Sequence, residues 1–192
     1  AYNSLGAMFE ARGQLDSAEY YYREGLEIAE YDERTTGIIM FMTDLGTIMF
    51  KKGKFKEAEE NYLKALKLAE QKEIAMRIAE VHLQLGELNK ATGNFQKAID
   101  HLEECISISQ DIGKKDYLRD SYDLLNKTYA ELGNYTKAYE YCGRFEELKS
   151  GIINEKMGKQ IADLEKRFEL ESYKRQLEAS RFENQKQQWT IY

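Results

Sequence analysis

The chain of 192 residues contains no proline, two cysteines and two histidines. Without proline, no helix can be ended by a fixed φ and a missing N–H, and glycine is a residue type that commonly ends helices instead. The cysteines, Cys105 and Cys142, are too few for a disulfide-rich scaffold, and we expect both to be buried free thiols. The histidines, His82 and His101, fit no metal-ligand spacing, and neither stands beside a cysteine or serine as a catalytic base would.

Motifs for phosphate and dinucleotide binding are also absent from the sequence. The formal net charge of −6 and the pI of about 5.2 argue against the basic face that non-specific nucleic-acid binding requires. The most apolar run, residues 37–50, is too short to span a bilayer and predicts a buried helix. We therefore predict no enzymatic activity, no cofactor, no metal site and no nucleic acid bound by this segment.

A repeat with a period of 40 residues runs through most of the chain. Its segments read GQLDSAEYYY, GKFKEAEENY, GNFQKAIDHL and GNYTKAYEYC. The repeat aligns glycines and alanines at Gly13, Gly53, Gly93, Gly133, Ala18, Ala58, Ala98 and Ala138. Leucines precede the glycines by eight residues, at Leu5, Leu45, Leu85 and Leu125. A fixed period of this length is typical of a repeat architecture in which each unit packs on its neighbours.

Each repeat is expected to form a helix, a tight turn and a second helix. The turn glycine adopts positive φ without a Cβ clash, which makes it a common helix terminus. Gly46 and Gly86 stand inside the first helix, where glycine costs about 1 kcal/mol relative to alanine. Their recurrence predicts that the paired helix approaches closely at this point, with Ala58 and its equivalents as the small facing surface.

The pattern Leu-Gly, six residues, Gly-x-φ-x-x-Ala, three residues, Tyr resembles the tetratricopeptide repeat (TPR) family. The resemblance covers roughly residues 1–150, and it departs from the family in its period of 40 instead of 34 and in the missing proline. Both departures point to the long-repeat variety of bacterial regulators. The resemblance implies an all-α, right-handed superhelix of four helical hairpins, at about residues 1–32, 33–72, 73–112 and 113–150, followed by a capping and connector helix over residues 151–192.

In the TPR family the first helix of each hairpin lines the concave face, and this implies a partner-binding groove. The groove residues are expected at Met40, Thr43, Thr47, Phe50, Glu80, Leu83, Glu87, Lys90, Asp120, Asp123 and Lys127, with Asn3, Ala7 and Glu10 in the first hairpin. An apolar floor beside an acidic half predicts a protein or peptide partner with an apolar anchor and a basic flank. In the alternative interpretation, Met40 and Phe50 only pack against neighbouring helices and the carboxylates are solvated.

One TPR subfamily grips the acidic tails of chaperones with basic groove residues. The corresponding positions hold Asn3, Ala7, Asp44, Glu80 and Gln84. The basic clamp is missing and the charge is reversed, so this function is not expected.

The segment after the last repeat is expected to form a long helix, separated from the repeats by Gly151. Apolar residues recur at spacings of four, four, three and four, at Ile153, Met157, Ile161, Leu164 and Phe168. They predict one apolar face that caps the solenoid. Homodimerisation through this helix is a further hypothesis. Localisation is open between the periplasmic face of a membrane-anchored protein and the cytoplasm.

The same segment is similar to the region that follows long-repeat TPR arrays in bacterial membrane-anchored sensors. This resemblance implies a membrane span beyond Tyr192, with Trp189, Ile191 and Tyr192 near the interface. Because the chain begins inside a helical pattern, we expect it to be part of a longer protein. We therefore predict a non-catalytic sensing domain of a signalling or transcription-regulating protein. A soluble scaffold that assembles protein partners is the alternative.

Overall fold

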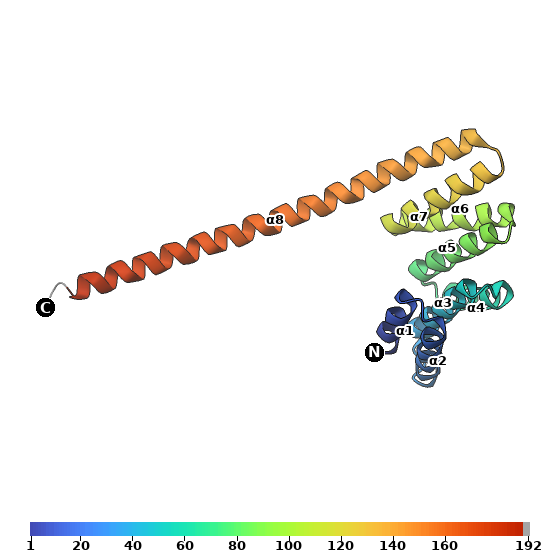
Figure 1. Ribbon diagram of the computed structural model, residues 1–192, viewed down its shortest axis with the longest axis horizontal. Coiled ribbons are helices and arrows are strands. Elements are labelled where there is room, and N and C mark those ends of the chain that lie inside the picture. The colour runs from blue at the N-terminus through green and yellow to red at the C-terminus, as the bar shows by residue number, and fades with distance from the viewer. Residues whose placement is uncertain (190–192) are drawn as a thin grey trace. The chain divides into compact units, whose positions relative to one another are not determined.

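All regular structure in the described part of the chain is α-helical (Figure 1). The computed structural model describes the backbone of residues 1–189 and the side chains of residues 1–171, 173 and 174. The expected roles of the Trp189, Ile191 and Tyr192 side chains therefore lie outside the described residues. The helices are α1 (Tyr2–Ala11), α2 (Leu15–Tyr31), α3 (Thr35–Lys51), α4 (Phe55–Gln71), α5 (Ala75–Ala91), α6 (Phe95–Asp111), α7 (Lys115–Glu131) and α8 (Tyr135–Trp189).

Three-residue turns of one type connect all the helices. In the turn after α3, the Gly53 N–H donates to the Phe50 carbonyl and the Lys54 N–H to the Met49 carbonyl, both at 2.9 Å. This pair of bonds is the Schellman motif, which places its central residue in the left-handed region. The four turn glycines predicted from the repeat have φ values of 72° to 76°, which confirms their role as helix terminators.

The connections between hairpins use the same turn, which the sequence did not reveal. Here Glu33 and Glu73 adopt φ of 53°, and Gly113 adopts φ of 68°. From α2 onward a helix begins every 20 residues, at positions 15, 35, 55, 75, 95, 115 and 135. The structure thus repeats every 20 residues, whereas the sequence repeats every 40. The sequence period is longer because glutamate takes the place of glycine in two of the turns between hairpins.

The helix-interior glycines accept an aromatic ring or a leucine from the partner helix. A Cβ atom placed on Gly46 would lie 2.5 Å from Cε1 of Tyr62, and one on Gly6 would lie 2.4 Å from Cε1 of Tyr22. The predicted close approach at these glycines is confirmed. The residue that faces Gly46 is Tyr62, four positions after Ala58. Ala58, which was predicted to face the glycine, is instead buried in the core cluster shared by the second and third hairpins.

The hydrophobic core consists of three clusters, each shared by two consecutive hairpins. One joins Tyr22 of α2 to Ile48 of α3, the next joins Tyr62 of α4 to Leu85 of α5, and the third joins Cys105 of α6 to Leu125 of α7. Each hairpin therefore shares its buried apolar residues with the next one along the chain, as in other solenoids. The free thiol of Cys105 is buried as expected, whereas that of Cys142 is only half-buried.

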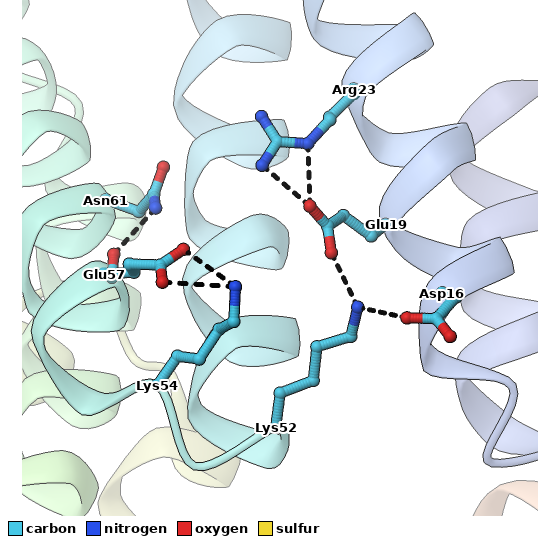
Figure 2. Close-up of polar contacts among 7 residues, drawn as sticks. All are labelled: Asp16, Glu19, Arg23, Lys52, Lys54, Glu57 and Asn61. Carbon is cyan, nitrogen blue, oxygen red and sulfur yellow. Dashed lines mark hydrogen bonds and ion pairs between the residues drawn. The ribbon is translucent and has the colours of Figure 1, made fainter.

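Ionic contacts bridge the first two hairpins at the turn edge. The Lys52 ammonium, which follows α3, donates to Asp16 Oδ1 at 2.5 Å and Glu19 Oε2 at 2.7 Å, both on α2 (Figure 2). The Arg23 guanidinium holds the other oxygen of Glu19 at 2.7 Å. The Lys52 ammonium lowers the pKa of Asp16. At Glu19 burial acts to raise the pKa, but Lys52 and Arg23 together lower it.

The chain divides into two units, residues 1–148 and the C-terminal residues that begin at Lys149. The helix break expected at Gly151 is absent, because α8 continues through Gly143, Gly151 and Gly158. The expected apolar face is present, with exposed fractions from 49% at Ile153 to 75% at Phe168. No helix within the described residues is both long enough and apolar enough to cross a membrane.

Candidate binding groove

The first helices of successive hairpins lie side by side and form one layer. Helix α3 contacts α5, and α5 contacts α7. Helix α1 joins this layer through an ion pair of 2.7 Å between Glu10 Oε1 and Lys51 Nζ of α3. The layer is the surface that the sequence predicted to face a partner, and its polar side chains meet in the region between α1, α3 and α5.

Asp44 lies at the centre of this polar region. Its Oδ2 atom is buried and has no hydrogen-bond partner among the described residues. Burial, followed by the negative charges of Glu80 and Glu10, raises the pKa of Asp44 to about 7, and Arg77 opposes the shift. A carboxyl group that titrates near neutrality and retains an unused acceptor can bind a cationic group, which would supply the missing hydrogen bond and charge.

Arg77 is the cation that lies closest to Asp44 in this polar region, and it forms an ion pair with Glu80. Its Nη1 atom donates to Glu80 Oε2 at 2.6 Å, whereas its Nε–H is buried without an acceptor in the described part of the chain. Arg77 pairs with Glu80, and Lys51 pairs with Glu10, so these four charges balance. The region therefore becomes anionic when Asp44 ionises.

A hydroxyl and amide network continues the groove from Asp44 toward α5. The Thr47 Oγ1 and Tyr62 hydroxyl oxygens lie 3.1 Å apart, and the Tyr62 hydroxyl donates to Gln84 Oε1 at 3.4 Å. Burial raises the pKa of Tyr62, so this hydroxyl stays protonated at all ordinary pH values. The network fixes the Gln84 amide at the groove surface, where its NH₂ group can donate to a partner.

The two predicted apolar residues of the groove are half-buried. Met40 packs against the cluster shared by the first two hairpins, and Phe50 packs against the cluster shared by the second and third. The Phe50 ring also lies 5.8 Å from that of Phe55, centroid to centroid. Both side chains therefore contribute to the core and keep a part of their apolar surface exposed.

Two other predicted groove residues are buried. Thr43 is 4% exposed and donates to the Ile39 carbonyl, and Leu83 is 7% exposed within the third core cluster. The following residues, Asp44 and Gln84, are more exposed. At these positions the exposed side of the helix is therefore shifted by one residue from the predicted side, which is a rotation of about 100° about the helix axis. The neighbouring helices cover Thr43 and Leu83, which spacing along one helix cannot reveal.

In the fourth hairpin the predicted charges lie beside opposite charges on their own helix. Asp123 pairs with Lys127 at 2.6 Å, and Asp120 pairs with Arg119 at 2.7 Å. Lys90 of α5 pairs with Glu131 of α7, while Glu87 is exposed. The carboxylates of Asp120 and Asp123 are therefore less available to a cationic partner than the sequence suggested.

In the first hairpin, the predicted groove residue Glu10 is held in place by two side-chain contacts. The Glu10 carboxylate accepts from the Tyr22 hydroxyl at 2.8 Å as well as from Lys51. Asn3 and Ala7 are exposed on α1. Glu10 is therefore held toward the same region as Asp44.

Sequence reasoning did not select Arg77 or the Tyr62 hydroxyl as groove groups, and it named Asp44 and Gln84 only as positions of a missing clamp. Arg77 lies three residues before Glu80, a helical spacing that favours their pairing and could have drawn attention to it. The Tyr62 hydroxyl comes from a core residue of the second helix. No signal in the first-helix pattern could have identified it.

Comparisons with known proteins agree on the architecture. A family model described as MalT-like TPR region matches residues 1–157. No curated protein matches the chain. Three similar solved structures have identities of 19% to 24%, which support the fold alone.

The first of these structures is BtubC (BKLC) from P. vanneervenii, with a TM-score of 0.69 at 21% identity over 79% of this chain and 63% of that one. The apo form of RapI gives a TM-score of 0.73 at 19% identity over 80% and 56%. The signal-transduction ATPase (STAND) protein with a tetratricopeptide repeat sensor from Pyrococcus horikoshii gives 0.68 at 24% identity over 81% and 24%. The chain thus spans less than two thirds of each of these proteins.

The family match extends over most of the chain and includes the whole first unit, with all of its hairpins. The repeat glycines, the buried repeat alanines and the stacked first helices are the features of a TPR-type solenoid. On this combination of sequence, structure and family match, the chain belongs to the MalT-like TPR region family.

Proposed function

We propose that this domain is a non-catalytic protein- or peptide-binding module whose groove accepts a basic side chain near Asp44 and an apolar side chain near Met40 and Phe50. The observation that carries the proposal is the unpartnered, buried Oδ2 atom of Asp44 in the layer of first helices. A lysine or arginine side chain would satisfy that acceptor and offset the charges of Glu10 and Glu80.

The apolar part of the proposal rests on the position of Met40 one helical turn before Asp44. Residues four apart lie on one face of a helix, so a partner that reaches Asp44 passes Met40. The partly exposed Phe50 lies further along the same helix. A partner with an apolar anchor and a basic flank therefore fits this groove, in line with helix or peptide recognition by solenoids.

Sensing within a membrane-anchored bacterial signalling or transcription-regulating protein is the role we propose for this module. The family match and the similarity to a STAND protein with a tetratricopeptide repeat sensor support it. Under this proposal, partner binding changes the packing of the first helices, and α8 transmits the change. The membrane would be reached only through a segment beyond Tyr192. We also propose that the exposed face of α8 mediates homodimerisation.

The alternative is a soluble TPR scaffold that assembles protein partners without a signalling output. The coding sequence beyond Tyr192 discriminates between the two. A membrane span followed by a kinase or DNA-binding module would support the sensor, and a stop codon or a polar continuation would support the scaffold.

A peptide-binding experiment tests the groove directly. An array of peptides that carry one apolar anchor and either a basic or an acidic flank is probed with the protein between pH 6 and pH 8. We expect basic-flanked peptides to bind preferentially and their affinity to rise with pH, because Asp44 loses its proton and becomes anionic as the pH passes its pKa of about 7. Asp44→Asn should remove this pH dependence and weaken binding at pH 8 by about tenfold.

Two controls separate the groove from general electrostatics. Asp111→Asn removes an exposed carboxylate outside the groove and should leave affinity and its pH dependence unchanged. The folded pKa of Asp44, about 7, lies above its ordinary value of 3.8, so the folded state loses stability as the pH rises from 3.8 to about 7, and the loss is fully present at pH 8. Asp44→Asn should therefore be no less stable than the wild type at pH 8. Equal binding of acidic-flanked peptides, or a pH response that persists in Asp44→Asn, would contradict the proposal.

A further inference from the structure

The only two histidines of the chain meet in the third hairpin. His82 on α5 and His101 on α6 place their Nδ1 atoms 3.1 Å apart, with ring centroids 5.2 Å apart and ring planes inclined by 51°. Both side chains are half-buried, so a small solute can reach them from solvent. The two residues are 19 positions apart on different helices, so their spacing along the chain matches no metal-ligand motif.

The fourth hairpin shows one way in which these two positions are filled. A shift of 40 residues maps the histidines onto Tyr122 and Tyr141 of the fourth hairpin, whose rings pack with centroids 6.0 Å apart. The position is therefore a packing pair between the two helices of a hairpin. Packing explains two rings in contact, but it does not require that two ring nitrogens face each other at hydrogen-bonding distance.

The distance between the two nitrogens is suitable for both to bind one metal ion. Two nitrogens 3.1 Å apart, each about 2.05 Å from one metal ion, subtend an angle of about 98° at the metal. This value lies between the ideal octahedral and tetrahedral angles. We propose that His82 and His101 form a two-nitrogen binding site for a divalent late-transition-metal ion such as Zn²⁺, which would tie α5 to α6.

The surroundings favour neutral imidazoles and a bound cation. Burial lowers the pKa of both rings, that of His82 to about 4, so both carry a free lone pair at neutral pH. The carboxylates of Asp100, Glu59 and Glu104 bias the electrostatic potential at His101 toward a positive ligand, and Lys97 opposes them. No group of three histidine, cysteine or acidic side chains surrounds a common point in the described region. Water, or a donor from a binding partner, would therefore complete the coordination.

Metal binding has a defined consequence for the protons of the pair. Without metal, one Nδ1–H donates to the other Nδ1, so one ring carries its proton on Nδ1. With both Nδ1 atoms on the metal, each neutral ring must carry its proton on Nε2. Binding moves one proton between the nitrogens of a single ring and releases none, so the two states differ by a tautomer that can be measured.

Nitrogen-15 NMR of the two imidazoles, recorded at pH 7 during a titration with Zn²⁺, tests the proposal on the intact chain. We expect both rings to reach the Nε2–H tautomer after one equivalent of Zn²⁺, and calorimetry to give one site. Zn²⁺ should also raise the melting temperature, because it binds the folded state in preference to the unfolded one. His82→Gln and His101→Gln should each weaken Zn²⁺ binding at least about tenfold.

The fourth hairpin supplies the matched control. The double variant His82→Tyr/His101→Tyr adopts the tyrosine pair found there, so it should keep the helical circular dichroism spectrum and lose both Zn²⁺ binding and the metal-dependent rise in melting temperature. Cys142→Ser removes a competing half-buried thiol and should leave binding intact. The proposal is overturned if only one imidazole responds to Zn²⁺, if the double tyrosine variant binds Zn²⁺ with unchanged affinity, or if no stoichiometric site is found.

Discussion

At the scale of single residues, glycine has two distinct uses in this chain. Gly53 and its equivalents take positive φ with open space around the missing Cβ, so backbone conformation alone selects glycine there. Gly46 is helical, and its missing Cβ makes room for the ring of Tyr62. The first use could be predicted from the repeat. The partner in the second use could not, since it depends on how the two helices are rotated against each other.

Gly46→Ala should destabilise the protein although alanine is the better helix former. The new Cβ would lie 2.5 Å from the Tyr62 ring, and a forced shift in a packed core typically costs 1–3 kcal/mol, against roughly 1 kcal/mol gained in helix propensity. Gly143→Ala is the matched control, because nothing lies within 4 Å of its Cβ position, and it should be neutral or stabilising. Thermal melts of both variants decide the matter. A loss for Gly143→Ala as large as that for Gly46→Ala would contradict the packing argument.

At the scale of helices, the joints between hairpins share one geometry but differ in chemistry. Glu10 and Lys51 pair across the first joint at 2.7 Å. The positions 80 residues further along hold Lys90 and Glu131, which pair with the opposite polarity across the third joint. The middle joint has Phe50 and Ala91 at these positions. The first and third joints therefore place an ion pair at equivalent positions, with the two charges exchanged.

A charge exchange tests whether the polarity at the third joint is interchangeable. Lys90→Glu places like charges at the joint and should destabilise the protein by about 0.2–1 kcal/mol, a small effect because the Glu131 side chain is 47% exposed. Adding Glu131→Lys reproduces the polarity of the first joint and should restore most of the loss. Urea unfolding of the single and double variants at low and high salt measures the coupling. A double variant no more stable than Lys90→Glu would mean that the two side chains do not interact.

At the scale of the whole molecule, the apolar face of α8 is a large feature outside the hairpin cores. Its five apolar residues, with exposed fractions between 49% and 75%, follow one another at helical spacing. The exposure of such a face to water is unfavourable. The face could be covered by the end of the solenoid, which the sequence predicted it to cap, or by another chain. These two uses remain alternatives, and they differ in their dependence on protein concentration.

Homodimerisation through α8 should appear as concentration-dependent association in sedimentation velocity. Ile161→Glu combined with Leu164→Glu should abolish it, because two charges would interrupt the centre of the apolar face. Lys166→Glu lies on the opposite side of the helix and should leave association unchanged. If the wild-type chain stays monomeric at all concentrations, or if the double variant associates as the wild type does, the face serves another purpose.

The sequence by itself determined the helical hairpins, their period and the turn glycines, because helix formation and termination depend on residues within a few positions of each other. It also placed Met40, Thr47 and Glu80 on the first-helix layer. Only the tertiary structure buried Thr43 and Leu83, gave Asp44 its raised pKa and brought His82 to His101. Each of these depends on the rotation and approach of helices that are distant in the sequence, and helical spacing along one segment does not specify that geometry.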